Sequence, residues 1–299
     1  MLLHAQNITD FSECLPTDNN TTPDEIYTER LGKLNTTIKM TYNKDVRNRI
    51  ERYTKHEQAA ISYILGASKF YFPIFEKVLK EYNMPLELCY ISAIESMMRP
   101  EAVSRKEAAG IWQLKAITAI EQGLKINSMV DERLDIFKST DAALHYLRFL
   151  YKLLDDNWTL AVAAYNCGLT RVERAIAKAN GSHDFWEIRK HLPIETRDYM
   201  PKFIAMAYIL NYYREHGISP AKTDLPELWD TVTINHQISL KQISDICNLD
   251  YAYIKKLNPQ YRTTLIHGEK EPATICLPKE AKKLLVANKS SVKCSDEDK

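Results

Sequence analysis

The sequence predicts a mainly helical protein that ends in a small domain of two strands and two helices. Apolar residues recur at helical spacing over most of residues 25–216, and only 8 of the 299 residues are Gly, which weakens helix interiors. After residue 217 the pattern changes to the alternation that is typical of a strand. We therefore expect a large helical domain, a linker and a compact βααβ domain.

The composition is that of a folded protein without a dominant surface charge. Hydrophobic residues make up 45% of the chain and charged residues 26%, and the formal net charge is +1. No overall field therefore favours nucleic acid, and no nucleic-acid partner is expected. Since no stretch reaches the roughly 18 apolar residues of a membrane span, we also expect no transmembrane helix.

Six widely spaced cysteines match no metal-binding pattern; they stand at positions 14, 89, 167, 247, 276 and 294. There is no CxxC pair and no Cys/His cluster at ligand spacing, so we expect no structural zinc, no other metal and no cofactor. An even number does not define disulfides, and isolated buried thiols are the simpler interpretation.

Residues 1–24 are expected to be a mobile arm or the remnant of an export signal. The first six residues resemble the end of a signal peptide with Ala5 at the cleavage position, which predicts an exported protein whose signal is truncated here. The alternative is the irregular start of a cytosolic protein. Glu13 precedes Cys14 where a lipoprotein has a small residue, so we expect no lipid anchor at this cysteine.

Residues 25–82 have the periodicity of helices, and one run within them is aromatic. The run at residues 70–75 precedes a predicted amphipathic helix from Ile74 to Tyr82. A carbohydrate platform would explain these rings, but core packing is the commoner explanation.

The next predicted helix carries a carboxylate near its end. Asn83 can cap it, Pro85 fits its first turn, and Pro100 forces an end soon after Met98. Its apolar residues are Leu86, Leu88, Ile91 and Ile94. Glu95 therefore lies in the last turn of a mostly buried helix, where the helix dipole and desolvation both raise a carboxylic pKa.

More helices are predicted after a loop at residues 99–116. Gly168 can end one of them in a left-handed turn, a capping box at residues 170–173 starts another, and Pro201 should kink the last. The remaining predicted helices are Thr140–Leu154, Trp158–Tyr165 and Ile194–Tyr213.

The C-terminal part is predicted to be a domain of its own. Residues 217–228 form the linker, 229–280 the βααβ domain and 281–299 a polar tail. The expected elements are strands at 229–234 and 273–278 and helices at 238–247 and 251–257.

Three short motifs carry the functional signal. The first is Glu95-Ser96, which puts a carboxylate at a helix end. The second is residues 110–113 (GIWQ), a glycine-containing loop that carries a glutamine, and the third is residues 164–168 (AYNCG), in which a tyrosine and an asparagine precede a glycine. Each alone has an ordinary explanation, such as a surface Glu, a core aromatic residue or a helix stop. As an ordered set they indicate a catalytic site, because a carboxyl with a raised pKa can protonate a leaving oxygen.

These motifs resemble the catalytic domain of family 1 lytic transglycosylases, in particular the membrane-bound lytic murein transglycosylase D subgroup. The resemblance covers residues 86–213 and includes a third motif at residues 195–199. It departs from the family at Met98, where Phe is favoured, and at Glu107, where Gly is common. Other positions that keep the family spacing are Pro100, Ala102, Ser104 and Ala108.

The resemblance implies a lysozyme-like (goose-type) fold and a defined chemistry. A single Glu cleaves the β-1,4 bond between N-acetylmuramic acid and N-acetylglucosamine in peptidoglycan, leaving 1,6-anhydromuramic ends. The enzyme would act on glycan strands in the periplasm or cell envelope. By position, Glu95 is acid and base, Ser96 and Tyr199 orient it, and the substrate-binding residues are Gly110, Gln113, Tyr165 and Asn166.

Residues 229–278 resemble a LysM module, which binds N-acetylglucosamine-containing glycans. The similarity lies in Leu257-Asn258-Pro259 and in the closing residues 275–278, whereas residues 235–237 (NHQ) replace the usual Gly-Asp. The module would add a second glycan-binding part.

Two alternatives remain open. A hydrolytic muramidase on the same fold would need a second carboxylate to activate water, and a non-catalytic wall-binding protein would need none. Cys167 lies beside the motif without a nearby His and is expected to be a bystander. The candidates for the second carboxylate are Glu101, Glu107, Glu173 and Asp198.

Overall fold

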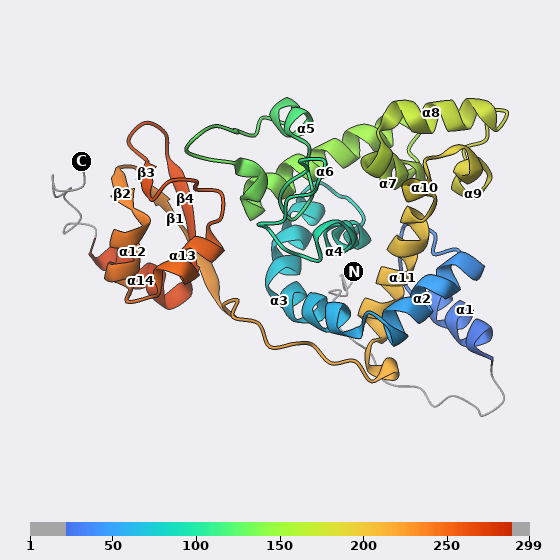
Figure 1. The fold of residues 1–299 in the computed structure, drawn as a ribbon, viewed down its shortest axis with the longest axis horizontal. Coiled ribbons are helices and arrows are strands. Elements are labelled where there is room, and N and C mark those ends of the chain that lie inside the picture. Colours follow the sequence, from blue (N-terminus) through green and yellow to red (C-terminus); the bar gives the residue numbers. More distant parts are fainter. Residues whose placement is uncertain (1–21, 289–299) are drawn as a thin grey trace, which may run out of the picture. The chain divides into compact units, whose positions relative to one another are not determined.

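The structure, a computed structural model, describes residues 22–288, which divide into two compact units (Figure 1). The first comprises residues 22–98 and 140–223, and the second comprises residues 99–139 and 224–288. Residues 1–21 of the predicted arm or export-signal remnant lie outside the described residues, as do Cys14, Cys294 and most of the predicted tail. Pro23 and Asp24, also predicted in the arm, instead begin a helix. The domain limits expected from the sequence stay a prediction, since these units are not contiguous stretches of chain.

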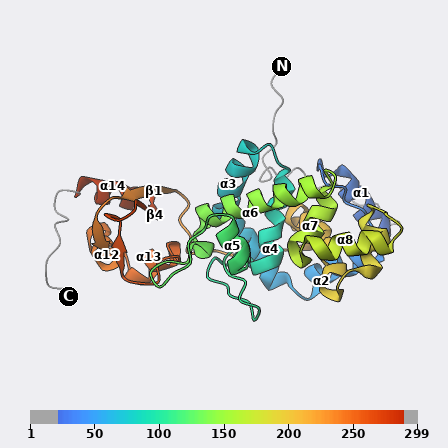
Figure 2. The same cartoon turned by 90° about the horizontal axis from the view of Figure 1, so that it is seen from above.

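Helices make up the regular structure of the first unit in its described part. They are α1 (Pro23–Lys33), α2 (Lys44–Lys55), α3 (Gln58–Glu81), η1 (Leu86–Cys89), α4 (Tyr90–Ser96), α6 (Ile136–Leu153, from residue 140), α7 (Trp158–Cys167), α8 (Leu169–Lys178), α9 (Phe185–Ile188), η3 (Arg189–His191), α10 (Ile194–Arg197), α11 (Tyr199–Tyr212) and η4 (Arg214–His216). Helix α11 contacts α2, α4 and α7. Helix α7 contacts α8, and the two lie side by side in Figure 2. Since α11 touches both α4 and α7, it connects the helices that carry most of the candidate residues.

The aromatic run at residues 70–75 lies inside α3, which corrects the prediction of a separate helix from Ile74. The helix continues for 24 residues through Pro73. Pro73 is exposed, so water can solvate the carbonyl that loses its helical partner. The four rings of the run are buried, which makes them core residues rather than a carbohydrate platform.

Helix boundaries around the candidate carboxylate also differ from the prediction. Asn83 does not cap a helix; it has φ +53°, and the 3₁₀ helix η1 precedes α4. The predicted helix at residues 194–213 is divided at Asp198 into α10 and α11. Pro201 therefore lies in the first turn of α11, where a missing N–H is tolerated and no kink is required.

Gly168 joins two helices directly. Its φ of +88° is positive, but its ψ of 150° lies outside the left-handed helical region, so the predicted left-handed turn is not formed, and α7 ends at the preceding residue. Helix α8 begins at Leu169, immediately after it, so the predicted capping box at residues 170–173 is wrong. The positive φ of one glycine does the work that was assigned to a side-chain cap.

The second unit begins with a segment of short elements, residues 99–139. It contains α5 (Ala116–Glu121), η2 (Glu132–Leu134) and the first residues of α6. Isolated β-bridges pair Ala109 with both Val103 and Leu114. The segment around the glutamine motif is therefore a folded loop with its own hydrogen bonds.

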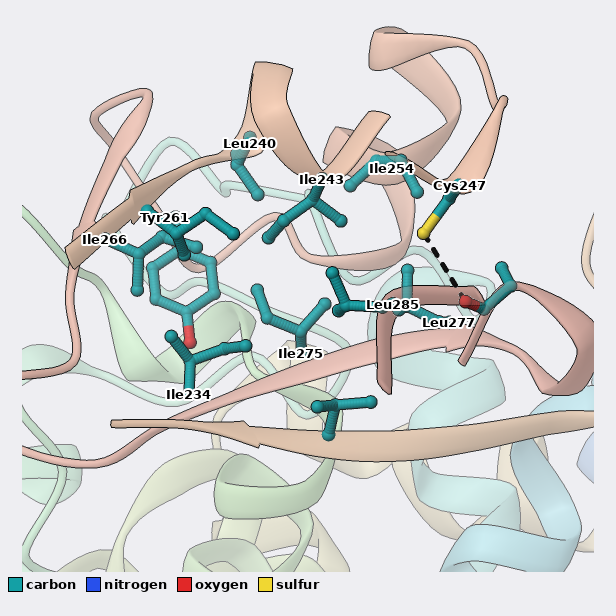
Figure 3. Close-up of a cluster of buried hydrophobic side chains, with 13 residues drawn as sticks. Ile234, Leu240, Ile243, Cys247, Ile254, Tyr261, Ile266, Ile275, Leu277 and Leu285 are labelled. Carbon is teal, nitrogen blue, oxygen red and sulfur yellow. Dashed lines mark hydrogen bonds between the residues drawn. The ribbon is translucent and has the colours of Figure 1, made fainter. Parts of the chain in front are cut away.

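The C-terminal part of this unit confirms the βααβ prediction and adds two short strands. Its elements are β1 (Trp229–Ile234), β2 (Gln237–Ser239), α12 (Leu240–Cys247), α13 (Tyr251–Leu257), β3 (Leu265–His267), β4 (Ala273–Pro278) and α14 (Lys279–Ala287). Strand β1 pairs antiparallel with β4, and β2 pairs antiparallel with β3. Figure 3 shows the apolar core that these elements enclose, with Tyr261 and Ile266 at one end and Cys247 at the other.

Helix α14 occupies residues that were expected in the polar tail. Ala281 and Leu285 are buried in the core of the C-terminal part, which explains why this charged segment is ordered as a helix. The fold class, mainly helical with a small βααβ domain at the C-terminus, is confirmed.

The four cysteines within the described residues are free thiols and are buried, as predicted; they are Cys89, Cys167, Cys247 and Cys276. Among residues 22–288, no helix has the length and apolar character needed to cross a membrane.

Candidate active site

Glu95 lies in the last turn of α4 and is followed by an unusual turn. Met97 and Met98 have φ values of +53° and +58°, so two consecutive non-glycine residues adopt the left-handed conformation. This conformation is unfavourable for residues with a side chain and persists where the surroundings fix it. Met98 is fully buried, which holds the turn in place and ends the helix next to Glu95.

Tyr199, the first residue of α11, reaches the carboxylate. Its hydroxyl donates a hydrogen bond of 2.5 Å to Glu95 Oε1. The break between α10 and α11 at Asp198 puts Tyr199 at a helix start, and its ring is buried. The structure therefore brings together two residues that are 104 positions apart in the chain.

The partly buried Glu95 carboxyl has a shifted titration. Burial raises the pKa of Glu95 to about 7, although the hydrogen bond from Tyr199 and the positive charge of Lys202 both lower it. Desolvation penalises the charged form and here outweighs both favourable partners. A carboxyl with this pKa can hold a proton near neutral pH and also release it.

Lys202 was not identified from the sequence. It follows Tyr199 by three residues on α11, so both side chains lie on the same side of the helix. That spacing was the available signal, but a Lys on a helix is usually only a solvated charge.

Tyr165 and Asn166, at the end of α7, lie in the same unit as Glu95. Burial and the Glu95 charge raise the pKa of Tyr165 well above its ordinary range, so its hydroxyl stays protonated. Asn166 Oδ1 accepts a hydrogen bond of 2.8 Å from the buried Thr196 hydroxyl of α10. Thr196 was not predicted, and it fixes the orientation of the Asn166 amide.

Ser96 and Cys167 have local roles in this geometry. The Ser96 hydroxyl donates to Ser92 O at 3.1 Å, one helical turn back, and its orienting of Glu95 stays a prediction. Burial raises the pKa of the Cys167 thiol above its ordinary value, against the opposing effects of Thr196 and Arg171. A neutral thiol is a poor nucleophile, in agreement with the expected bystander role.

Gly110 and Gln113 belong to the second unit. Gly110 has φ +85°, and a Cβ there would lie 1.8 Å from Arg133 O, so the close approach that requires glycine is to the protein's own backbone. Gln113 also has a left-handed φ, and its Nε2 donates to Ala102 O at 3.0 Å and to Gly110 O at 2.9 Å. The Gln113 amide nitrogen therefore holds the loop in shape.

The four candidates for a second carboxylate differ in their surroundings. Asp198 pairs with Arg49 and lies 3.6 Å from Lys202 Nζ, so its charge is neutralised. Glu101, Glu107 and Glu173 are exposed. Asp198 is half-buried like Glu95 but is ion-paired with Arg49, and the other three lack the burial of Glu95.

Comparison with known proteins finds a domain family that is similar to each of two parts of the chain. Residues 72–188 match the transglycosylase SLT domain, and residues 229–293 match the LysM-like domain of lytic transglycosylase MltD. The first match spans Glu95, Gln113 and Tyr165, and the second spans the βααβ domain.

Relatives share part of their length with this chain. The membrane-bound lytic murein transglycosylase D of Escherichia coli (strain K12) is 33% identical over 241 residues, covering 80% of this chain and 52% of that protein. A putative tributyltin chloride resistance protein of Alteromonas sp. (strain M-1) is 39% identical over 99 residues, covering 33% of this chain and 48% of that protein. The chain spans about half the length of these curated relatives.

Among solved structures, the 70 kDa soluble lytic transglycosylase of Escherichia coli is similar at a TM-score of 0.42. The identity is 24%, over 48% of this chain and 24% of that chain.

Proposed function

We propose that this chain is a peptidoglycan lytic transglycosylase, because residues 72–188 match the transglycosylase SLT domain and residues 229–293 match the LysM-like domain of lytic transglycosylase MltD. The observation that carries the proposal is the Glu95 carboxyl, which is partly buried, bonded to Tyr199, and has a pKa raised by burial to about 7. The substrate is the β-1,4 bond between N-acetylmuramic acid and N-acetylglucosamine.

In the first step Glu95 acts as a general acid. The protonated carboxyl donates its proton to the glycosidic oxygen, the bond from this oxygen to C1 of N-acetylmuramic acid breaks, and the N-acetylglucosamine portion leaves with a free 4-hydroxyl. The raised pKa supports this role, since an ordinary Glu would already be ionised near neutral pH.

In the second step the same residue acts as a base. The Glu95 carboxylate takes the proton of the muramic C6 hydroxyl, whose oxygen bonds to C1 and closes the 1,6-anhydro ring. No water is consumed, so no second carboxylate is needed to activate one. The neutralised Asp198 and the exposed positions of the other three candidates favour this route over a muramidase.

Tyr199 orients the reacting carboxyl in this proposal. Its hydrogen bond to Oε1 fixes one oxygen of Glu95 and stabilises the carboxylate that forms after proton transfer. Asn166, held by Thr196, is proposed to bind an N-acetyl or hydroxyl group of the substrate, and Tyr165 to border the same site. Ser96 supports the helix end that carries Glu95.

Gly110 and Gln113 complete the proposed substrate-binding residues. Since the Gln113 nitrogen already donates to Ala102 O and Gly110 O, we expect its side-chain oxygen to accept a hydrogen bond from the sugar. The LysM-like domain is proposed to bind the same glycan, and the protein to act in the periplasm or cell envelope. The matched relative in Escherichia coli is called membrane-bound and murein-acting, which agrees with this location.

Digestion of purified peptidoglycan with the wild type and with Glu95→Gln tests the proposal. The products are reduced with borohydride, which modifies reducing ends only, and are then identified by mass spectrometry. We expect anhydromuropeptides from the wild type alone, each lighter by one water than the unreduced hydrolysis product and unchanged in mass by borohydride. Glu173→Gln, which changes an exposed Glu of α8, is the matched control and should digest like the wild type.

Other product patterns would contradict the proposal. Reducible ends that disappear in Glu95→Gln would identify a muramidase that uses Glu95. Digestion by neither protein, with retention on a peptidoglycan pellet, would identify a binding protein without turnover.

A further inference from the structure

We infer that Arg262, in the LysM-like domain, is a positioning residue for the loop that carries Gln113. The connection runs through Asp131 and Arg133, and all of it lies within the second unit. The inference concerns how the proposed substrate-binding loop is held, and its effect on catalysis rests on the proposed function.

The first step is a backbone pairing between two segments far apart in the chain. Asp131 N donates to Gln260 O at 2.9 Å, and Arg262 N donates to Met129 O at 2.8 Å. Val130 and Tyr261 form an antiparallel bridge between these bonds. The loop before η2 is therefore paired, like a short strand, with the connection between α13 and β3.

The second step is a carboxylate shared by two arginines. Asp131 Oδ2 accepts from Arg262 Nη2 and from Arg133 Nη2, both at 2.8 Å, and Asp131 Oδ1 accepts from Arg133 Nε at 3.0 Å. The Asp131 side chain is only 3% exposed, against 9% for Arg133 and 44% for Arg262. Burial alone would raise the pKa of Asp131, but the two arginines outweigh it and the pKa is lowered.

The third step leads from Arg133 to the glutamine loop. Arg133 Nη1 donates to Glu107 O at 2.8 Å and to Leu114 O at 3.4 Å, which are the two sides of the loop. The Arg133 carbonyl also lies where a Cβ of Gly110 would be. Arg133 thus contacts the loop at both ends and at its glycine.

The fourth step explains why Arg262 matters at the junction, meaning the contact between residues 129–131 and 260–262. The junction contains a cavity of about 140 Å³, whose lining includes Lys125, Val130, Glu132, Tyr261, His267 and Lys270. An incompletely filled junction is stabilised less by apolar packing, so its polar contacts contribute more of its stability. Arg262 supplies two of them, since its Nη1 also donates to Asn127 O at 2.8 Å.

Hydrogen exchange of the full chain tests the coupling without using activity. We compare the wild type, Arg262→Gln, Arg262→Lys and Lys282→Gln. Lys282 pairs with Asp230 at 2.6 Å elsewhere in the LysM-like domain and is the matched control. The reporters are the hydrogen-bonded amides of Ala109, Gly110 and Leu114.

In Arg262→Gln we expect the hydrogens of these loop amides to exchange with solvent about tenfold faster. This factor corresponds to the loss of one hydrogen bond to a charged group. The amides of β1 and β4 should be unaffected, Arg262→Lys should restore part of the protection, and Lys282→Gln should match the wild type. On soluble glycan strands Arg262→Gln should raise KM about tenfold with little change in kcat, and the pH profile due to Glu95 should stay in place.

Unchanged loop exchange in Arg262→Gln would overturn the inference. So would faster exchange spread equally through the loop, β1 and β4, because that pattern means general loss of the domain. A wild type without transglycosylase activity but with the expected exchange pattern would refute the proposed function and support the coupling. Faster loop exchange with kcat lowered and KM unchanged would refute a role in substrate positioning.

Discussion

The Tyr199 hydroxyl donates a 2.5 Å hydrogen bond to Glu95 Oε1, and Glu95 nonetheless has a pKa raised to about 7. The two facts define the site, because the bond stabilises the carboxylate while burial favours the protonated acid. A residue that acts as an acid in one step and as a base in the next needs a pKa at which both the protonated carboxyl and the carboxylate are populated.

Glu95→Gln should stabilise the protein at high pH. The pKa of Glu95 rises from 4.5 to about 7 on folding, so the unfolded chain ionises first and the wild type loses stability between pH 4.5 and about 7. The neutral amide avoids this loss. We expect the variant to gain roughly 3 kcal/mol above pH 7, at about 1.4 kcal/mol for each pH unit between the two values, and nothing below pH 4.5. Urea denaturation across this range measures the difference, and a gain that grows toward low pH would contradict the raised pKa.

Tyr199→Phe should move the activity profile toward higher pH. The change removes a donor that favours the ionised form, so the pKa of Glu95 should rise further and the acid should stay protonated longer. We expect the alkaline limb to shift upward by about one pH unit and kcat to fall about tenfold, from the loss of a charge-assisted bond. Tyr212→Phe, on the same helix with its hydroxyl on Arg30 O, is the control and should keep the wild-type profile. A limb displaced to lower pH would show that the bond does not act as described.

Gly110→Ala should be far more destabilising than Gly123→Ala. Both glycines have nearly the same φ, +85° and +84°, so the strain of a left-handed Ala, about 1–2 kcal/mol, is common to the pair. Only Gly110 also meets a backbone atom, Arg133 O, at 1.8 Å, whereas Gly123 has open space. We expect the difference in unfolding free energy between the variants to exceed about 2 kcal/mol by denaturant titration. Equal losses would mean that the loop adapts freely around a new methyl group.

Asp198→Asn should leave the products unchanged. Asp198 is neutralised by Arg49 and Lys202, so we expect anhydro products at a rate within about threefold of the wild type and a stability loss of at most about 1 kcal/mol. Product analysis after borohydride reduction checks this. Reducible ends from the wild type that disappear in Asp198→Asn would instead make Asp198 the water-activating carboxylate of a muramidase.

The fold class and the C-terminal elements followed from local patterns. The alternating segments at residues 229–234 and 273–278 pair as β1 and β4, because alternation of apolar residues with period 2 is typical of a strand and of few other structures. The errors were at helix boundaries. A separate helix was expected from Ile74 and a kink at Pro201, but Pro73 lies on an exposed face of one continuous helix and Pro201 lies in a first turn, and only tertiary context determines that.

The candidate site was partly predictable. The motifs identified Glu95, Tyr165, Asn166 and Tyr199, but not Thr196 or Lys202, which matter through contacts that sequence spacing does not reveal. Gly110 was assigned to the approach of a sugar, whereas the structure gives Arg133 as its neighbour. A glycine motif predicts a close approach without identifying what approaches.

The discontinuity of the second unit has a consequence for synthesis. Residues 99–139 leave the ribosome long before residues 260–262, with which they pair. At roughly 5–20 residues per second, Asp131 would wait on the order of ten seconds for Arg262. During this time the glutamine loop lacks its final support while the helices of the first unit are still being made.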